Sequence, residues 1–239
     1  MADPRPQSSE PTGPERPPVP ARSGAWSAAV GLAFLIVIVV AGVNALGTRD
    51  DGSLGIESRA GEPVPQFAVP DAESSLEGDA NVFQDDCASA RLPCPGGDRR
   101  RPACEVPGRR VIRICDYFDR PLVISFWFTR GGDCESEQDV VDRSARRYGH
   151  RVGFLSLNVR DDRGTVRRIV RDRHWTVPVG HDRDGAVSNL LRVGGCPTFL
   201  YVLPGGIIYS SSIGELGEGE LAKRVDRLRR ESKRVADAR

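Results

Sequence analysis

The segment PLVISFWFTRGGDC, residues 121–134, decides the fold. It opens with a continuous apolar run rich in β-formers, as expected for a strand covered on both faces. A glycine-containing turn follows, and residues 134–148 have the pattern of a helix. The segment therefore places Cys134 at the start of a helix that directly follows a buried strand. A second motif, GGCPTF at 194–199, brings a further cysteine, Cys196, to the start of another strand.

The pattern around this segment predicts an α/β fold. PVPQFAVPDAE at 63–73 has a short apolar alternation typical of a strand. Further strands are expected at 121–128, 151–159, 198–203 and 206–210, and helices at 134–148, 164–174, 185–192 and from about 216. Strands that alternate with helices and end in a hairpin and a helix indicate a central sheet with helices on both faces. This domain is expected to cover residues 63–235.

The amino-terminal part has a different composition. Residues 1–24 are polar and rich in proline, so they are expected to form a disordered cytoplasmic tail. Residues 25–46 carry no charge, and an apolar stretch of about 20 residues is long enough to cross a bilayer as one helix. A cleaved signal peptide is one alternative, because Val43-Asn44-Ala45 resembles a cleavage site, and a fully buried helix of a soluble protein is another. Signal peptides have a shorter apolar region, which favours the transmembrane helix.

The charges that flank residues 25–46 predict the orientation of this helix. More arginines precede it than follow it, which favours a cytoplasmic tail and a large extracytoplasmic domain. Residues 47–62 then form a polar linker. The six cysteines also suit an oxidising compartment. We therefore expect a single-pass protein of the cell membrane, anchored through residues 25–46.

The order of elements and motifs resembles the thioredoxin fold, and in particular the membrane-anchored, extracytoplasmic redoxins of the TlpA/ResA type within the AhpC/TSA group. Three segments carry the resemblance: PQFAVPD, CDYFDRPLVISFWFTRGGDCESE and PVGHDRDGAVSNLLRVGGCPTFLYVLPGGII. The resemblance implies thiol–disulfide exchange with protein thiols or disulfides of the cell envelope, without a cofactor. It does not explain residues 74–110, a cysteine-rich insertion.

The chain departs from this family in its catalytic loop. On the family's CxxC motif, Gly131 takes the place of the nucleophilic cysteine and Cys134 that of the resolving cysteine, while Arg130 takes the place of a tryptophan. Ser125 lies where thioredoxins often carry a buried acid. Asp133 is expected to cap the helix that Cys134 begins. Without a thiol at Gly131, the usual two-cysteine exchange cannot run inside this loop.

The resemblance also suggests a replacement partner for Cys134. It places Pro197 at the family's cis-proline, in a loop that lies against the start of the catalytic helix, with Cys196 directly before it. Cys196 and Cys134 could form a disulfide if their Cα atoms lie within about 7 Å. The candidate catalytic residues are therefore Cys134, Cys196 and Pro197. A permanent structural disulfide and a pair of buried free thiols are the alternatives.

The other four cysteines, Cys87, Cys94, Cys104 and Cys115, lack the close C-x₂₋₄-C pairs of structural zinc sites. Two disulfides fit an exported insertion better, and three connectivities are open. The three histidines, His150, His174 and His181, have no spacing suited to a metal, so no metal site is expected.

Three functions remain from the sequence. The first is a thiol–disulfide oxidoreductase that uses Cys134 with Cys196. The second is an inactive pseudo-redoxin that binds an envelope protein. The third and weakest is a peroxiredoxin-like peroxidase, because the Thr or Ser that such enzymes carry three residues before the reactive cysteine is Gly131 here. The net charge of +1 gives no reason to expect nucleic acid as a partner.

Overall fold

The computed structural model describes residues 30–39, 60–82, 102–130 and 132–238. The chain divides into two units, residues 1–49 and 50–239. In the first unit, residues 30–39 form a helix with exposed side chains. No helix within the four described ranges is long and apolar enough to cross a membrane. The rest of the predicted span, and the predicted tail at 1–24, lie outside the described residues.

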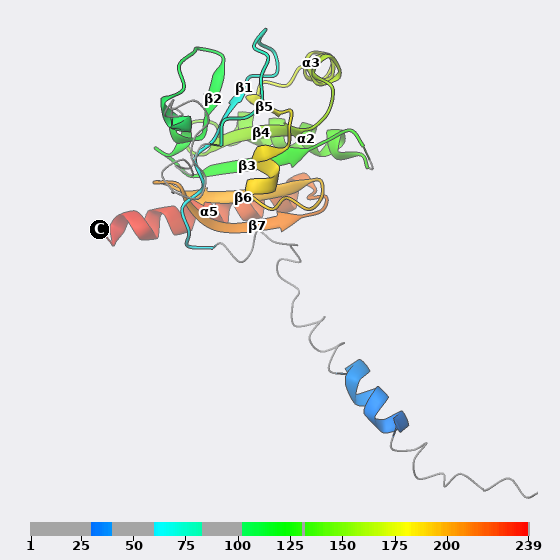
Figure 1. Ribbon diagram of the computed structural model, residues 1–239. Helices are drawn as coiled ribbons and strands as arrows, with labels where there is room; N and C mark the ends of the chain where they lie inside the picture. The colour runs from blue at the N-terminus through cyan, green and yellow to red at the C-terminus, as the bar shows by residue number, and fades with distance from the viewer. Residues whose placement is uncertain (1–29, 40–59, 83–101, 131, 239) are drawn as a thin grey trace, which may run out of the picture. The chain divides into compact units, whose positions relative to one another are not determined.

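The second unit is built on a five-stranded sheet with the order β5-β4-β3-β6-β7 (Figure 1). β4 lies parallel to β3 and β5 parallel to β4, whereas β6 and β7 run antiparallel to their neighbours. The strands are β3 (Leu122–Trp127), β4 (Gly153–Val159), β5 (Val179–Asp182), β6 (Thr198–Leu203) and β7 (Ile207–Ile213). The predicted strand at 121–128 is thus the middle strand of the sheet.

Every residue of β3 is buried, as its unbroken apolar run predicts. Val123 and Trp127 belong to a hydrophobic cluster on one face of the sheet. Leu122, Ile124 and Phe126 belong to a cluster on the other face. Because successive side chains of a strand point to opposite faces, one short segment supplies both halves of the core.

Helices cover both faces of this sheet, as predicted. α2 (Cys134–Tyr148), α3 (Arg163–Asp172) and α5 (Glu218–Asp237) bury residues in the cluster that contains Val123. The short helix α4 (Ala186–Leu190) contributes Val187 to the opposite cluster. α2 has the bounds that the sequence predicts.

The segment before β3 forms a two-stranded sheet that packs against the core of the main sheet. β1 (Ala68–Pro70) pairs antiparallel with β2 (Val111–Arg113), and isolated bridges at Pro63 and Asp71 join this segment to β7 and β5. The strand predicted at 63–73 is therefore shorter than expected, since its prolines cannot donate ladder hydrogen bonds. Within the predicted insertion, Cys104 forms a disulfide with Cys115 across a Cα–Cα distance of 5.8 Å. Cys87 and Cys94 lie outside the described residues.

Candidate active site

The structure joins Cys134 and Cys196 in a disulfide, with their Cα atoms 6.0 Å apart. The sheet explains why residues so distant in sequence meet. β3 and β6 are antiparallel neighbours, with Phe126 opposite Thr198. The end of β3 and the start of β6 therefore lie at one edge of the sheet. The chain leaves that edge into α2 at Cys134, and it returns there through Cys196. The Cys196–Pro197 peptide bond is cis.

The two sulfur-bearing residues differ in their access to solvent. Cys134 is the first residue of α2, is only 2 % exposed, and belongs to an apolar cluster with Trp127 and Phe199. Cys196 is partly exposed at the rim of the same cluster. A sulfur on another molecule can therefore approach Cys196 more easily than Cys134.

Asp133 caps α2, as predicted. Its carboxylate accepts a hydrogen bond of 3.3 Å from the Ser136 backbone N–H. Such a cap satisfies one of the free N–H groups of the first helical turn. A reduced Cys134 would thus lie between two opposing influences. The helix N-terminus stabilises a thiolate, and the neighbouring carboxylate opposes it.

A neutral polar cluster lies where the family often has a buried acid. The Ser125 and Ser156 hydroxyls each donate a hydrogen bond of 2.8 Å to the Gln138 side-chain oxygen. All three residues are fully buried, and Gln138 lies one helical turn after Cys134. The Gln138 side-chain nitrogen has no hydrogen-bond partner among the described residues, and the cluster contains no carboxyl group that could exchange a proton with a cysteine.

The Asp161 carboxylate holds the start of the loop between β3 and α2. Its oxygens accept hydrogen bonds from the Thr129 backbone N–H at 2.7 Å and from the Thr129 hydroxyl at 2.9 Å. The Asn158 amide donates a third at 2.7 Å, and the exposed Arg130 guanidinium lies 3.7 Å away. The Asp161 side chain is only 3 % exposed, so it acts as a buried anchor for the loop.

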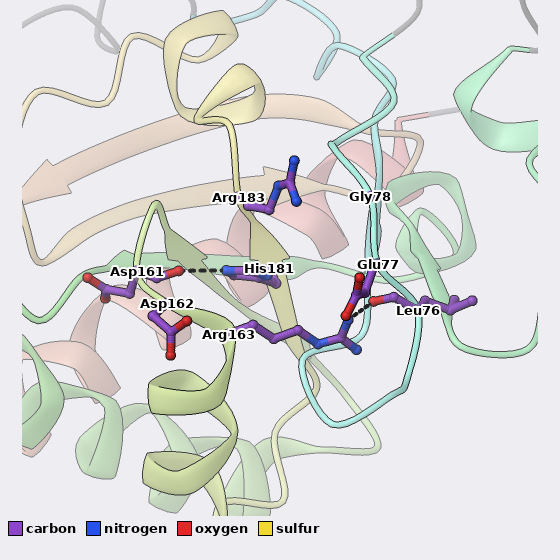
Figure 2. A pocket seen from close by; sticks show the side chains of 8 residues that line it. All are labelled: Leu76, Glu77, Gly78, Asp161, Asp162, Arg163, His181 and Arg183. Atoms are coloured by element: carbon purple, nitrogen blue, oxygen red, sulfur yellow. Dashed lines mark hydrogen bonds between the residues drawn. The ribbon is translucent and has the colours of Figure 1, made fainter.

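Asp161 also lines a pocket of about 270 Å³ (Figure 2). The His181 ring reaches the Asp161 backbone carbonyl at 2.9 Å, and Arg163 extends across the pocket to the Leu76 carbonyl. Side chains of both charges line the pocket. Its lining residues are Leu76, Glu77, Gly78, Asp161, Asp162, Arg163, His181 and Arg183. Among the described residues, no group of three or more His, Cys, Asp or Glu side chains could hold a metal ion.

Glu137 is a buried acid near the disulfide that the sequence analysis missed. It lies three residues after Cys134, is buried, and accepts a hydrogen bond of 3.0 Å from the Leu216 backbone N–H. Burial raises the pKa of the Glu137 carboxyl, and the hydrogen bond from Leu216 offsets part of this rise. An acidic residue on the inward face of a predicted helix was the available signal.

Glu137→Gln is expected to make the protein less sensitive to pH. An acid with a raised pKa in the folded state stabilises the fold at low pH, and this contribution is lost as the pH rises through the raised pKa. The glutamine side chain keeps an oxygen that can accept from Leu216 but cannot ionise. The free energy of unfolding of the variant minus that of the wild type should therefore increase as the pH rises from about 4 to about 7. Urea denaturation across this range measures it, with Glu73→Gln at an exposed site as the control. A constant difference would contradict the assignment.

The sheet order and the flanking helices define a thioredoxin-like α/β fold, with the Cys134–Cys196 disulfide where β3 ends and β6 begins. No family model matches the sequence. The chain is 25 % identical over 119 residues to the thiol-disulfide oxidoreductase ResA of Oceanobacillus iheyensis, and 23 % identical over 118 residues to that of Geobacillus kaustophilus. Each match covers 49 % of this chain, and they cover 58 % and 68 % of the two relatives. The predicted resemblance to TlpA/ResA-type redoxins is thus confirmed.

Solved structures agree on the fold. A DsbE-type thiol:disulfide interchange protein from Chlorobium tepidum matches with a TM-score of 0.52 at 14 % identity, covering 71 % of this chain and 97 % of that one. A DsbF homologue from Corynebacterium diphtheriae matches with a TM-score of 0.52 at 17 % identity, covering 73 % and 93 %.

Proposed function

We propose that this protein is a thiol–disulfide oxidoreductase whose exchangeable disulfide is Cys134–Cys196. One observation carries the proposal: the disulfide lies where β3 leads into α2, with one sulfur at the start of a 15-residue helix. Thiolates at helix N-termini are stabilised by the N–H groups and the dipole of the helix. The likeness to proteins named thiol-disulfide oxidoreductases supports it. The substrates are protein thiols or disulfides, and Pro197, beside Cys196, shapes the groove that receives them.

The proposal also includes the cellular location of the protein. Residues 25–46 anchor the protein in the membrane, and the redoxin domain faces the oxidising side. The uncharged composition of this segment and the disulfide Cys104–Cys115 support this arrangement. If residues 25–46 form the anchor, the full chain resists carbonate extraction from membranes, and deletion of these residues releases it. Extraction of the full chain would refute the anchor.

Cys196→Ser is expected to abolish catalysed disulfide exchange. The remaining Cys134 thiol then has no partner cysteine that could release a bound substrate. The rate of disulfide reduction therefore falls to that of the uncatalysed reaction. Reduction of insulin disulfides with dithiothreitol as electron donor measures this. The double variant Cys104→Ala/Cys115→Ala should keep the wild-type rate, because Cys115, in η5 (Ile114–Tyr117), packs against the hydrophobic cluster on the opposite face of the sheet from Cys134. Equal rates in wild type and Cys196→Ser would refute the proposal.

A pseudo-redoxin is the second candidate. The absence of a thiol at Gly131 and the neutral Ser125–Gln138 pair favour it. In that case the groove beside Pro197 binds an envelope protein, and Cys134–Cys196 only holds the fold together. A wild-type protein with no insulin reduction, together with retained binding of an envelope protein, would favour this candidate over the first.

A further inference from the structure

The exposure of the two cysteines sets the order of events in the exchange. Cys134 is 2 % exposed and packs in the cluster that contains Trp127, Val141 and Phe199. Cys196 is partly exposed. Thiol–disulfide exchange requires the attacking sulfur to reach its target along the axis of the bond that breaks, so access decides which sulfur is used.

Two carboxylates anchor described residues on either side of Gly131. Asp161 accepts two hydrogen bonds from Thr129, and Asp133 caps α2 by accepting one from the Ser136 backbone N–H. Between these anchors lies Gly132, where a Cβ atom would be 3.7 Å from the Cys134 sulfur. The backbone at Gly132 thus lies close to this sulfur. With only 2 % of Cys134 exposed, an external protein sulfur reaches Cys134 less easily than the partly exposed Cys196.

We infer that Cys196 is the sulfur that bonds to the substrate, and that Cys134 is the resolving sulfur. This inference rests on the proposed oxidoreductase function. The position of Cys134 at the start of α2 does not show whether its sulfur bonds to the substrate or resolves the mixed disulfide, and the inference assigns it the second role. It also moves the substrate-bonding sulfur out of the helix loop, where the usual CxxC motif has it, to the residue before Pro197.

The steps balance as a two-electron exchange. In the reduced protein, the Cys196 thiolate attacks a substrate disulfide R–S–S–R′, which forms Cys196–S–S–R and releases R′–S⁻. The Cys134 thiol passes its proton to R′–S⁻, and its sulfur attacks the Cys196 sulfur. The Cys134–Cys196 bond forms and R–S⁻ leaves. The substrate is reduced to a thiol, R′–SH, and a thiolate, R–S⁻, and the two protein sulfurs are oxidised to a disulfide. In the reverse direction, a substrate thiolate attacks Cys196 and Cys134 leaves as the thiolate.

Two single variants test the order. Reduced Cys134→Ser keeps the exposed thiol, and reduced Cys196→Ser keeps the covered one. With oxidised glutathione and with insulin as probes, Cys134→Ser should form the mixed disulfide at least about tenfold faster. Peptide mapping by mass spectrometry identifies the modified cysteine. In urea the two variants should react at similar rates, because the difference comes from the fold.

The outcomes separate the inference from the function on which it rests. Faster trapping by Cys196→Ser overturns the inference and leaves the oxidoreductase intact. If neither folded variant forms a mixed disulfide, both the inference and the proposed oxidoreductase function are wrong. If a variant does not fold, limiting iodoacetamide on the reduced wild type replaces it. Labelling of Cys196 before Cys134 supports the order, and the reverse refutes it.

Discussion

Asp161→Ala is expected to lower the free energy of unfolding by about 3 kcal/mol, because it leaves buried donors without an acceptor. The Thr129 backbone N–H and the Asn158 amide both donate to this carboxylate. Alanine offers no acceptor to these donors. The loop before Cys134 should loosen as well, so iodoacetamide should label the reduced Cys134 thiol faster than in the wild type. Urea denaturation and labelling rates measure the two effects.

The neighbouring residue is a matched control for this substitution. Asp162 is exposed, and its carboxylate accepts from the Thr165 backbone N–H as the N-cap of α3. Asp162→Ala should lower the free energy of unfolding by less than Asp161→Ala does, through the loss of an N-cap, without changing the labelling of Cys134. Equal losses of stability at the two positions would show that Asp161 is not a buried anchor.

Removal of the Cys134–Cys196 disulfide is expected to lower the free energy of unfolding by about 4 kcal/mol on the chain-entropy model. The bond joins residues 62 apart in sequence, so it restricts the unfolded chain strongly. Cys104 and Cys115 are 11 apart, and loss of their bond should cost about 3 kcal/mol. Urea denaturation of the two double alanine variants compares these losses.

The size of this loss bears directly on the proposed function. Domains are commonly stable by about 5–15 kcal/mol, so a protein that loses about 4 kcal/mol can remain folded. Exchange requires a folded reduced state, because Cys134 must lie close to Cys196 to resolve a mixed disulfide. A reduced domain that unfolds at room temperature would indicate that the bond is structural.

The sequence predicts the central layer of the fold because that layer depends on local patterns. The apolar run of β3 reflects a strand that is buried on both faces. The helical spacing of the apolar residues in α2 reflects a helix that is buried on one face. β5 was not predicted, since Val179–Asp182 is a four-residue edge strand without alternation, and it is a strand because it pairs with β4. The pairing of Cys104 with Cys115 was also open, because spacing alone permits three connectivities.

The candidate site was predictable in part for a similar reason. The family resemblance identifies Cys134, Cys196 and Pro197 by their motifs. It does not identify Asp161 or Glu137, whose importance comes from contacts made by distant residues. Asp161 is an anchor because the Thr129 backbone N–H donates a hydrogen bond to its carboxylate. The buried Glu137 carboxyl likewise accepts a hydrogen bond from the Leu216 backbone N–H. Neither contact leaves a pattern in the sequence around the acid.

Disulfide mapping by mass spectrometry under graded reductant shows whether Cys134–Cys196 is an exchangeable bond. Cys134 begins a 15-residue α-helix, whereas Cys104 and Cys115 lie in 3₁₀ helices of three and four residues. Only Cys134 therefore gains the stabilisation that a helix N-terminus gives a thiolate. The exchangeable pair should be reduced reversibly in the folded domain at potentials where Cys104–Cys115 stays oxidised. If Cys134–Cys196 resists reductant until the domain unfolds, it is a structural bond and the protein is not an oxidoreductase.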